Sequence, residues 1–292
     1  MIRNWRHEDG QNAGENEIFA RNVEKWVEHG ATRLDLCFAL IENDNVVGGI
    51  AFSSTESEAV YILDFSMSVN SFHLGAELII RSIESLSLRK VCYHLYNDND
   101  LYNQYRQCFL DAGFIAAQEK LSYRFTKETI ESNESDIVYR SFAEVGEKVF
   151  IDAVAAVTRQ TLDSVDSTAV SEHGETEVAE TLIKDLKELD FQPDIWLLAY
   201  HNEKFIGLVI PTNFGDVRGT ILGGINYIGV LPEERGKGYV DTLLIKGTQL
   251  LISQGVTTII ADIDVLNYPM KNALERNSYV FHCEEVILEK TC

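Results

Sequence analysis

The sequence has few basic residues and no long apolar run. Its 292 residues include 25 Lys and Arg against 46 Asp and Glu, which gives a net charge of -21. Such a surface repels a phosphate backbone, and no local basic stripe offsets the repulsion, so we expect no nucleic-acid partner. No apolar stretch approaches the roughly 18 residues that a membrane helix needs, so we expect no membrane partner either.

Cysteine is also scarce. The five cysteines are an odd number, and none stands in a CxxC pair: Cys37, Cys92, Cys108, Cys283 and Cys292. This scatter argues against a disulfide framework or a zinc site and favours free thiols in a reducing compartment. The N-terminus passes directly into polar, acidic sequence without the apolar core of a signal peptide. We therefore predict a cytoplasmic protein that holds no metal.

What the sequence does contain is enough apolar material for two folded domains. A hydrophobic content of 45% with 10% aromatics excludes a disordered chain. At about 100–200 residues per domain, the length predicts two domains. The best boundary is the polar, acidic segment 127–136, which lies between two strand-like segments. We therefore expect one domain at residues 1–130 and a second at residues 136–292.

Both halves show the same order of predicted elements. In the second half, apolar spacing predicts helices over 150–159, 178–189, 240–251 and 269–277, and strands over 137–140, 195–200, 205–210, 224–231, 256–265 and 279–288. The first half repeats the order hairpin, strand, helix, strand, helix with weaker signals, over 38–52, 60–67, 75–86, 90–96 and 101–112. This repeated order predicts an α/β architecture with mixed sheets and an internal duplication.

The most informative segment runs from Tyr227 to Val240. A buried strand is followed by a proline, then by Gly236 and Gly238, and at once by a helix. This geometry directs several backbone N–H groups and a helix N-terminus at one place, which is an anion site suited to a pyrophosphate. Arg235 and Lys237 add cations to a chain that is otherwise strongly negative. The alternative is a surface connection whose glycines serve only the turn, and the basic pair favours the anion site.

The turn that starts at Arg235 resembles the cofactor-binding turn of the GNAT superfamily of N-acetyltransferases, Arg/Gln-x-x-Gly-x-Gly/Ala. It departs from the pattern at its last position, where this chain has valine. The resemblance implies that backbone groups of Ile228, Gly229 and Val230 pair with the pantetheine arm of acetyl-CoA. It also implies that the pyrophosphate is held by the N–H groups of Gly236, Lys237, Gly238, Tyr239, Val240 and Asp241, the last with its side chain turned away.

Asn267 follows the next strand and matches the family asparagine that contacts the cofactor. The alternative is that it caps the following helix, because Asn is a favoured N-cap residue, and the two roles can coexist. These motifs cover residues 194–290. The resemblance implies an α/β (α+β) fold of two GNAT-like domains, each with a central mixed sheet flanked by helices.

Two carboxylates are candidates for the chemistry. Asp262 and Asp264 share one face of the predicted strand 256–265, which is costly unless they are solvated or used. A base must remove a proton from the acceptor ammonium before acetyl transfer, and Asp262 matches a position where some family members hold a carboxylate base. Asp264 is the second candidate. The alternative for both is a solvated strand end, or a counter-ion for a cationic acceptor.

The family tyrosine that protonates the leaving thiolate is absent, because its position is occupied by Leu274. Either another tyrosine substitutes or water supplies the proton; the candidates are Tyr227, Tyr239, Tyr268 and Tyr279. The segment 161–174 is polar, acidic and without periodicity, and its simplest interpretation is a solvated acidic loop. As a group its charged residues favour a cationic acceptor; they are Asp163, Asp166, Glu172 and His173.

The corresponding turn of the first half, Met67–Gly75, has one glycine and no arginine or lysine, and it carries bulky Phe72 and Leu74. We expect it not to bind the cofactor and the first domain to be a degenerate copy that shapes the acceptor cleft or mediates assembly, for example as a homodimer. His73 is a candidate catalytic residue there, although a lone loop histidine is more often incidental.

The sequence thus predicts an acetyl-CoA-dependent N-acetyltransferase that acts on a small, cationic primary amine by direct attack. The alternative is a non-catalytic acyl-CoA-binding or interaction module of the same fold. A nucleotide-binding protein is disfavoured because the chain lacks a GxxxxGK[ST] turn.

Overall fold

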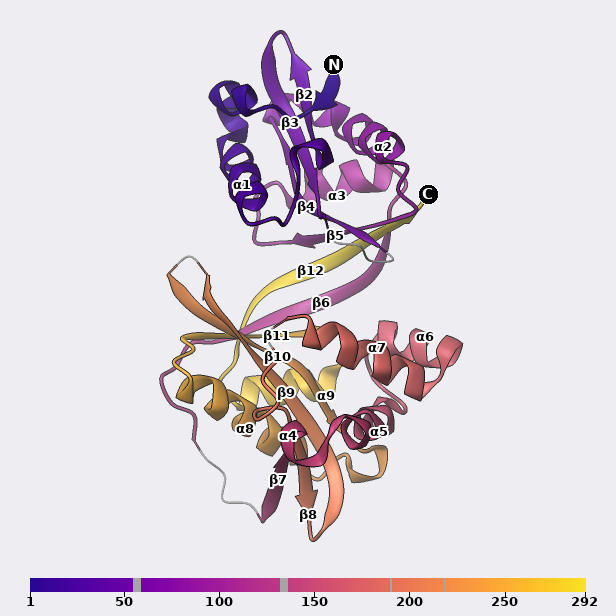
Figure 1. The fold of residues 1–292 in the computed structure, drawn as a ribbon, viewed down its shortest axis with the longest axis vertical. Coiled ribbons are helices and arrows are strands. Elements are labelled where there is room, and N and C mark those ends of the chain that lie inside the picture. Colours follow the sequence, from indigo (N-terminus) through magenta and orange to yellow (C-terminus); the bar gives the residue numbers. More distant parts are fainter. Residues whose placement is uncertain (55–58, 132–135, 190, 218) are drawn as a thin grey trace. The chain divides into compact units, whose positions relative to one another are not determined.

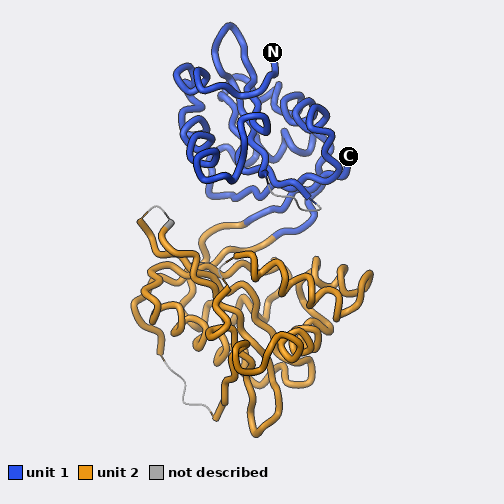
Figure 2. Tube along the Cα trace, viewed as in Figure 1, with its two compact units in different colours: residues 1–119, 285–292 blue, residues 120–284 orange. Residues whose placement is uncertain are grey.

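The computed structural model describes residues 1–54, 59–131, 136–189, 191–217 and 219–292 and divides the chain into two compact units (Figure 2). Unit 1 contains Met1–Glu119 and Glu285–Cys292, and unit 2 contains Lys120–Glu284. Each unit is a mixed β-sheet flanked by helices (Figure 1), which confirms the predicted α/β class. Within the described residues, no helix combines the length and the apolar character needed to cross a membrane.

The sheet of unit 1 has the strand order β1-β2-β3-β4-β5-β12. Neighbouring strands are antiparallel except β4 and β5, which run parallel. Helix α1 covers one face over an apolar cluster that includes Phe19, and α2 and α3 cover the other over a cluster that includes Phe109. Helix α1 is not among the elements predicted from the sequence. The elements are β1 (Ile2–Asn4), α1 (Glu17–Glu28), β2 (Cys37–Glu42), β3 (Asn45–Phe52), β4 (Val60–Met67), α2 (Gly75–Leu86), β5 (Lys90–Tyr96), α3 (Tyr102–Asp111) and the last part of β12 (Val280–Thr291).

The sheet of unit 2 has the order β6-β11-β10-β9-β8-β7, in which only β10 and β11 run parallel. Helices α5 and α7 cover a face whose core includes Trp196, and α8 and α9 cover the face whose core includes Leu244. The elements are β6 (Ile115–Phe125), β7 (Ile137–Ser141), α4 (Phe142–Val145), α5 (Glu147–Thr158), α6 (Ser164–His173), α7 (Glu175–Lys187), β8 (Leu197–His201), β9 (Lys204–Val217), β10 (Thr220–Val230), α8 (Tyr239–Ser253), β11 (Thr258–Asp264) and α9 (Tyr268–Arg276).

Helix α6 differs from the expected acidic loop. Its N-cap is Asp163, whose carboxylate accepts hydrogen bonds from the N–H groups of Val165 and Asp166. None of its ten residues, all of them described, is buried. A helix that buries no side chain needs no apolar stripe, which is why the segment shows no helical periodicity.

The units divide at a different place from the expected domains 1–130 and 136–292. The second half of β6 pairs with β11 in unit 2, and the last residues of β12, Glu285–Thr291, pair with β5 in unit 1. Burial explains both pairings, because Tyr123 belongs to the core of unit 2 and Leu288 to the core of unit 1. Each sheet is therefore completed by a strand from the far side of the predicted boundary. Residues 132–135 of that boundary lie outside the described residues.

The two units share one strand order. In each, an antiparallel hairpin leads to a third strand, which pairs in parallel with the strand after the next helix. The parallel ladder joins three residue pairs in both units, Val60–Ile62 with Val91–Tyr93 and Leu222–Gly224 with Thr258–Ile260. This shared topology supports the internal duplication that the sequence predicts.

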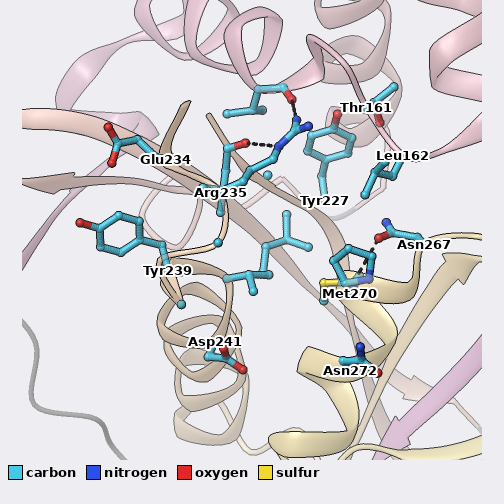
Figure 3. Close-up of a pocket in the computed structure, with 18 of the residues that line it drawn as sticks. Thr161, Leu162, Tyr227, Glu234, Arg235, Tyr239, Asp241, Asn267, Met270 and Asn272 are labelled. Carbon is cyan, nitrogen blue, oxygen red and sulfur yellow. Dashed lines mark hydrogen bonds between the residues drawn. The ribbon is translucent and has the colours of Figure 1, made fainter. Parts of the chain in front are cut away.

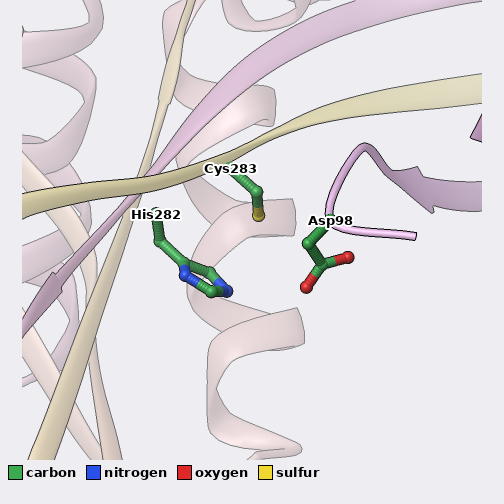
Figure 4. Close-up of side chains that lie close together, drawn as sticks. All are labelled: Asp98, His282 and Cys283. Carbon is green, nitrogen blue, oxygen red and sulfur yellow. The ribbon is translucent and has the colours of Figure 1, made fainter. Parts of the chain in front are cut away.

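Four of the five cysteines are buried, among them Cys283, which follows His282 on β12 (Figure 4). Burial raises the pKa of the Cys37, Cys92 and Cys108 thiols to about 11. These three thiols therefore stay protonated near neutral pH and serve as packing groups rather than as nucleophiles.

The assignment of β12 to unit 1 and of β6 to unit 2 can be tested. Leu288 of β12 is fully buried in unit 1, so Leu288→Ala should destabilise that unit by about 2–5 kcal/mol. Hydrogen exchange followed by mass spectrometry should show faster exchange in β5 and unchanged exchange in β11. The matched variant Leu121→Ala, on β6, should show faster exchange in β11 and unchanged exchange in β5. Faster exchange in β11 for the Leu288 variant would contradict this assignment of the strands.

Candidate active site

The site begins where two parallel strands separate. The ladder between β10 and β11 ends at the pair Gly224 and Ile260, although β10 continues to Val230 and β11 to Asp264. Beyond this point β10 remains paired with β9, and its register shifts between Ile225 and Tyr227. The shift is a β-bulge, which bends the strand and re-aims its side chains. The far end of β10 thus turns an open edge away from β9.

The loop after β10 is built around two glycines in left-handed backbone conformations. Gly236 has φ 78° and Gly238 has φ 82°, and Gly238 is the N-cap of α8. A Cβ added to either glycine would meet nothing within 4 Å, so the backbone conformation and not crowding requires glycine. Because α8 starts at Tyr239, its first N–H groups precede any intrahelical acceptor, although that of Asp241 already donates to the Gly238 carbonyl oxygen at 3.1 Å. The loop therefore presents backbone donors and the positive end of a helix dipole to open space.

Arg235 does not extend toward this space. Its guanidinium donates hydrogen bonds to the carbonyl oxygens of Arg159 and Gln160, at 3.0 and 2.7 Å. It also donates to those of Val157 and Val230, at 3.3 and 3.2 Å, the two bonds drawn in Figure 3. Burial lowers its pKa from the usual value. The side chain thus ties the end of α5 to the end of β10. This contact differs from the expected one with a pyrophosphate, because the unsatisfied carbonyls of a helix C-terminus attract the same cation.

Lys237 is also engaged within the protein. Its Nζ lies 2.7 Å from Oε2 of Glu234, whose other oxygen accepts a hydrogen bond from Lys204. Glu234 is only 5% exposed, and the two lysines hold its pKa below the ordinary value. The Lys237 side chain is about half exposed, so its charge still reaches the open space beside the loop.

A cavity of about 530 Å³ joins these parts (Figure 3). The β10 edge, the glycine loop, the start of α8, the start of α9 and the segment after α5 all contribute to its wall. Residues from each of these segments line it, among them Tyr227, Val230, Gly238, Asp241, Asn267 and Thr161. One continuous cavity thus connects the backbone donors of the loop with the far end of β10, from Tyr227 to Val230.

Asn267 and Asp241 both line this cavity, and each has a partner in the protein. The Asn267 side chain accepts a hydrogen bond from the Met270 N–H at 3.2 Å and caps α9. The Asp241 carboxylate accepts from Arg276 at 2.9 Å and from Asn277 at 2.7 Å. The Asp241 carboxylate is thus held toward the end of α9, and its N–H donates to the Gly238 carbonyl oxygen at 3.1 Å.

The two candidate carboxylates of β11 have different environments. Asp264 is 2% exposed and accepts hydrogen bonds from the N–H and hydroxyl of Ser164 and from the Leu266 N–H. It ties the first turn of α6 to the end of β11, a structural role that differs from the expected catalytic one. Asp262 is exposed on the same face of the strand. It is thus the more accessible of the two to an acceptor.

The tyrosines proposed as substitutes for the missing acid lie in different places. Tyr239 reaches His201 at 3.0 Å, Tyr279 is buried against Thr248, and Tyr268 is 60% exposed. Tyr227 lines the cavity, and its hydroxyl lies 3.3 Å from Asp166 of α6. Leu274, at the position of the family acid, is fully buried in the core.

The other residues of the acidic segment face solvent. His173 lies 3.5 Å from Glu177 and 3.8 Å from Glu172, and all three side chains are more than half exposed. Asp163 and Asp166 are the exceptions, since both are part-buried: Asp163 caps α6, and Asp166 lies against Tyr227. From the sequence, Asp166 is predicted only as part of an acidic group, because its contact with β10 joins residues 61 positions apart.

The corresponding turn of unit 1 is closed by side chains. Residues Val69–Leu74 form a 3-10 helix, and Phe72 and Leu74 pack against the core. A Cβ added to Gly75 would lie 2.5 Å from the Cys108 sulfur, so this glycine serves packing against α3. His73 is exposed. These contacts support the expectation that this turn does not bind a pyrophosphate.

Comparisons with known proteins agree with this geometry. Residues 160–279 match the model of the acetyltransferase (GNAT) family. A solved GCN5-related N-acetyltransferase from Sphaerobacter thermophilus has a TM-score of 0.67 and 14% identity, covering 100% of this chain and 95% of that one. A GNAT-family acetyltransferase from Colwellia psychrerythraea gives 0.54 and 13%, with 100% of both chains covered. No curated protein matches the sequence.

A tandem GNAT protein from the clavulanic acid biosynthesis pathway also has this fold, with a TM-score of 0.56 and 9% identity over 100% of this chain and 98% of that one. At such low identity these structures show the fold alone. Together with the family match, they confirm the resemblance predicted from the glycine turn.

The different roles of the two loop cations generate a prediction. Arg235→Met removes hydrogen bonds to four carbonyl oxygens and should cost about 2 kcal/mol of local stability, which speeds hydrogen exchange at the end of α5 roughly 30-fold. Lys237→Met removes one half-exposed ion pair and should change exchange there by less than about threefold. Equal effects of the two variants on α5 would show that Arg235 does not anchor this helix.

Proposed function

We propose that this chain transfers the acetyl group of acetyl-CoA to a primary amine of a small acceptor, since residues 160–279 match the model of the acetyltransferase (GNAT) family. The amine nitrogen attacks the thioester carbon directly, the C–S bond breaks, and coenzyme A leaves as a thiol. One observation carries the proposal: a single cavity joins the glycine loop to the open edge of β10.

In this proposal the backbone of the chain holds the cofactor. The N–H groups from Gly236 to Asp241 bind the pyrophosphate, as the helix N-terminus at Tyr239 favours; that of Asp241 shares its proton with the Gly238 carbonyl oxygen. The open edge of β10 at Ile228, Gly229 and Val230 pairs with the amides of the pantetheine arm, as one more strand would. Asn267 lines the same cavity while it caps α9. Arg235 supports the loop from behind, and Lys237 adds a charge at its rim.

The acceptor in this proposal is cationic. The face of β11 that carries Asp262 and Asp264 lies toward α6, whose first turn is bound to Asp264. Asp163 and Asp166 of that turn add negative charge, which attracts an ammonium group. Asp262 then acts on the acceptor either as a base or as a counter-ion. We further propose that the protein works in the cytoplasm, without a metal, and that unit 1 shapes the acceptor site or supports a homodimer.

A non-catalytic acyl-CoA-binding module is the second candidate, favoured by the buried Leu274 at the position of the family acid. A thiolate is a good leaving group, so water can replace that acid. An assay of thiol release from acetyl-CoA with a panel of amines, amino acids and aminoglycosides decides between the two. Release with at least one amine supports transfer, and tight coenzyme A binding without release from any amine supports the module.

The glycine loop provides a prediction on cofactor affinity. Gly238→Val places a β-branched side chain at φ 82° and into the open space in front of the loop, and it should weaken coenzyme A binding at least 100-fold. Gly255→Val is the matched control, since Gly255 has φ 84°, follows the same helix and also has nothing within 4 Å of an added Cβ. Calorimetry should find near-normal affinity for the control. Normal affinity for the Gly238 variant would refute the proposed pyrophosphate site.

Asp262 provides a second prediction. Asp262→Asn removes the exposed charge of β11 and should lower kcat/KM for the amine at least tenfold at neutral pH, while the Kd of coenzyme A changes by less than about twofold. Asp185→Asn, at an exposed position of α7, is the control for a lost surface charge. Equal kcat/KM in the Asp262 variant and the wild type would remove this residue from the mechanism.

A further inference from the structure

The contact between α6 and β10 links a half-buried carboxylate to the cavity. Asp166 Oδ2 and the Tyr227 hydroxyl lie 3.3 Å apart, and Tyr227 lines the cavity at the bulge of β10. We propose that Asp166 and Tyr227 form a proton relay that removes a proton from the acceptor ammonium. The relay rests on the proposed acetyl transfer and adds to it the route by which the nucleophile is made neutral.

Tyr227 is the catalytic residue of the pair, because its side chain borders the space where an acceptor meets the thioester. It precedes Ile228, Gly229 and Val230, whose open edge is proposed to hold the pantetheine arm. The bulge between Ile225 and Tyr227 sets the direction of its ring. An amine above the bulge can therefore meet the phenol and the thioester carbon together.

Asp166 is the positioning residue, and β11 fixes its place. Asp264 accepts hydrogen bonds from the N–H and hydroxyl of Ser164, two residues before Asp166 on the first turn of α6. Asp163 caps the same turn through the N–H of Asp166 itself. Two independent anchors thus hold the Asp166 carboxylate against the tyrosine. The same hydrogen bonds satisfy the buried side chain of Asp264.

The charges around the pair set when it can accept a proton. Burial and, next, the neighbouring Asp163 raise the pKa of Asp166 to about 6, while the Tyr227 hydroxyl and Lys120 of β6 act in the opposite direction. Burial and Asp166 hold the pKa of Tyr227 well above its ordinary value, and Arg235 opposes this weakly. Near neutral pH the pair is therefore a carboxylate and a neutral phenol. Below about pH 6 Asp166 is protonated and the relay is blocked.

The proton balance is simple. The ammonium passes one proton to the Tyr227 oxygen while the phenol passes its own proton to Asp166, so the phenol stays neutral and Asp166 becomes a carboxylic acid. The neutral amine attacks the thioester carbon, a C–N bond forms and the C–S bond breaks. The second amine proton goes to the thiolate sulfur, directly or through water, and Asp166 later returns its proton to solvent. In this scheme Asp262 attracts the acceptor rather than deprotonating it.

The test compares pH profiles of kcat with both substrates saturating. The wild type should lose activity below an apparent pKa near 6. Tyr227→Phe and Asp166→Asn should each lower kcat about 100-fold or more and abolish this acid limb, because each interrupts the relay. Asp262→Asn should instead act mainly on the KM of the amine. Calorimetry with coenzyme A checks that each variant keeps a folded cofactor site.

Asp163→Asn serves as the matched variant, since Asn also caps helices but carries no charge. Its acid limb should move to lower pH, because the negative charge that raises the pKa of Asp166 is gone. Wild-type kcat and an unchanged acid limb in Tyr227→Phe and Asp166→Asn would overturn the relay and leave acetyl transfer in place. Wild-type protein that binds coenzyme A but releases no thiol with any amine would overturn the proposed function and the relay with it.

Discussion

The separation of β10 from β11 is the constraint on which the rest of unit 2 depends. Two parallel strands that stayed paired to their ends would bury their backbone donors and acceptors in a ladder and leave no room for a ligand. Here the ladder stops at Gly224 and Ile260, and the bulge beyond it bends β10 away. An open backbone edge is tolerated only where solvent or a ligand can satisfy it, since each unsatisfied buried group costs about 1–3 kcal/mol. The cavity provides that access.

The elements around the open edge keep it from closing. Arg235 fixes the end of β10 to the end of α5, and Asp264 fixes the end of β11 to the start of α6. A hydrogen-bonded side chain thus holds each strand end to a neighbouring helix. The glycine loop then has a defined place from which α8 begins.

The cations beside this cavity bind groups of the protein itself. The chain carries a net charge of -21, yet the cations near the loop are largely committed to the protein itself. Arg235 binds carbonyl oxygens, Lys237 binds Glu234, and Arg276 binds Asp241. Attraction for an anion therefore falls mainly to backbone N–H groups and the dipole of α8. Such donors are fixed by the fold, and they need no side-chain ordering when a ligand arrives.

The sequence predicts local features well, because they depend on neighbouring residues. The glycine turn and the start of α8 near Tyr239 depend on short-range backbone preferences. It also predicts the duplicated order of strands, since apolar periodicity marks each element.

Features that depend on distant contacts could not be predicted in this way. The pairing of β6 with β11 and of β12 with β5 joins residues more than 130 positions apart. Arg235 donates to carbonyl oxygens at the end of α5, and Asp264 accepts from Ser164 at the start of α6. Both contacts depend on how these helices pack against the sheet, and no local sequence pattern predicts that packing. Helix α6 buries none of its own described side chains, so it lacks the apolar stripe by which helices are recognised.

A crystal structure of the protein with acetyl-CoA bound tests the central claim most directly. The account predicts the pyrophosphate at the N–H groups that follow Gly236, with the pantetheine arm along the open edge of β10 and the thioester beside Tyr227. A cofactor bound at the Val69–Leu74 turn of unit 1, with the glycine loop of unit 2 vacant, would contradict it.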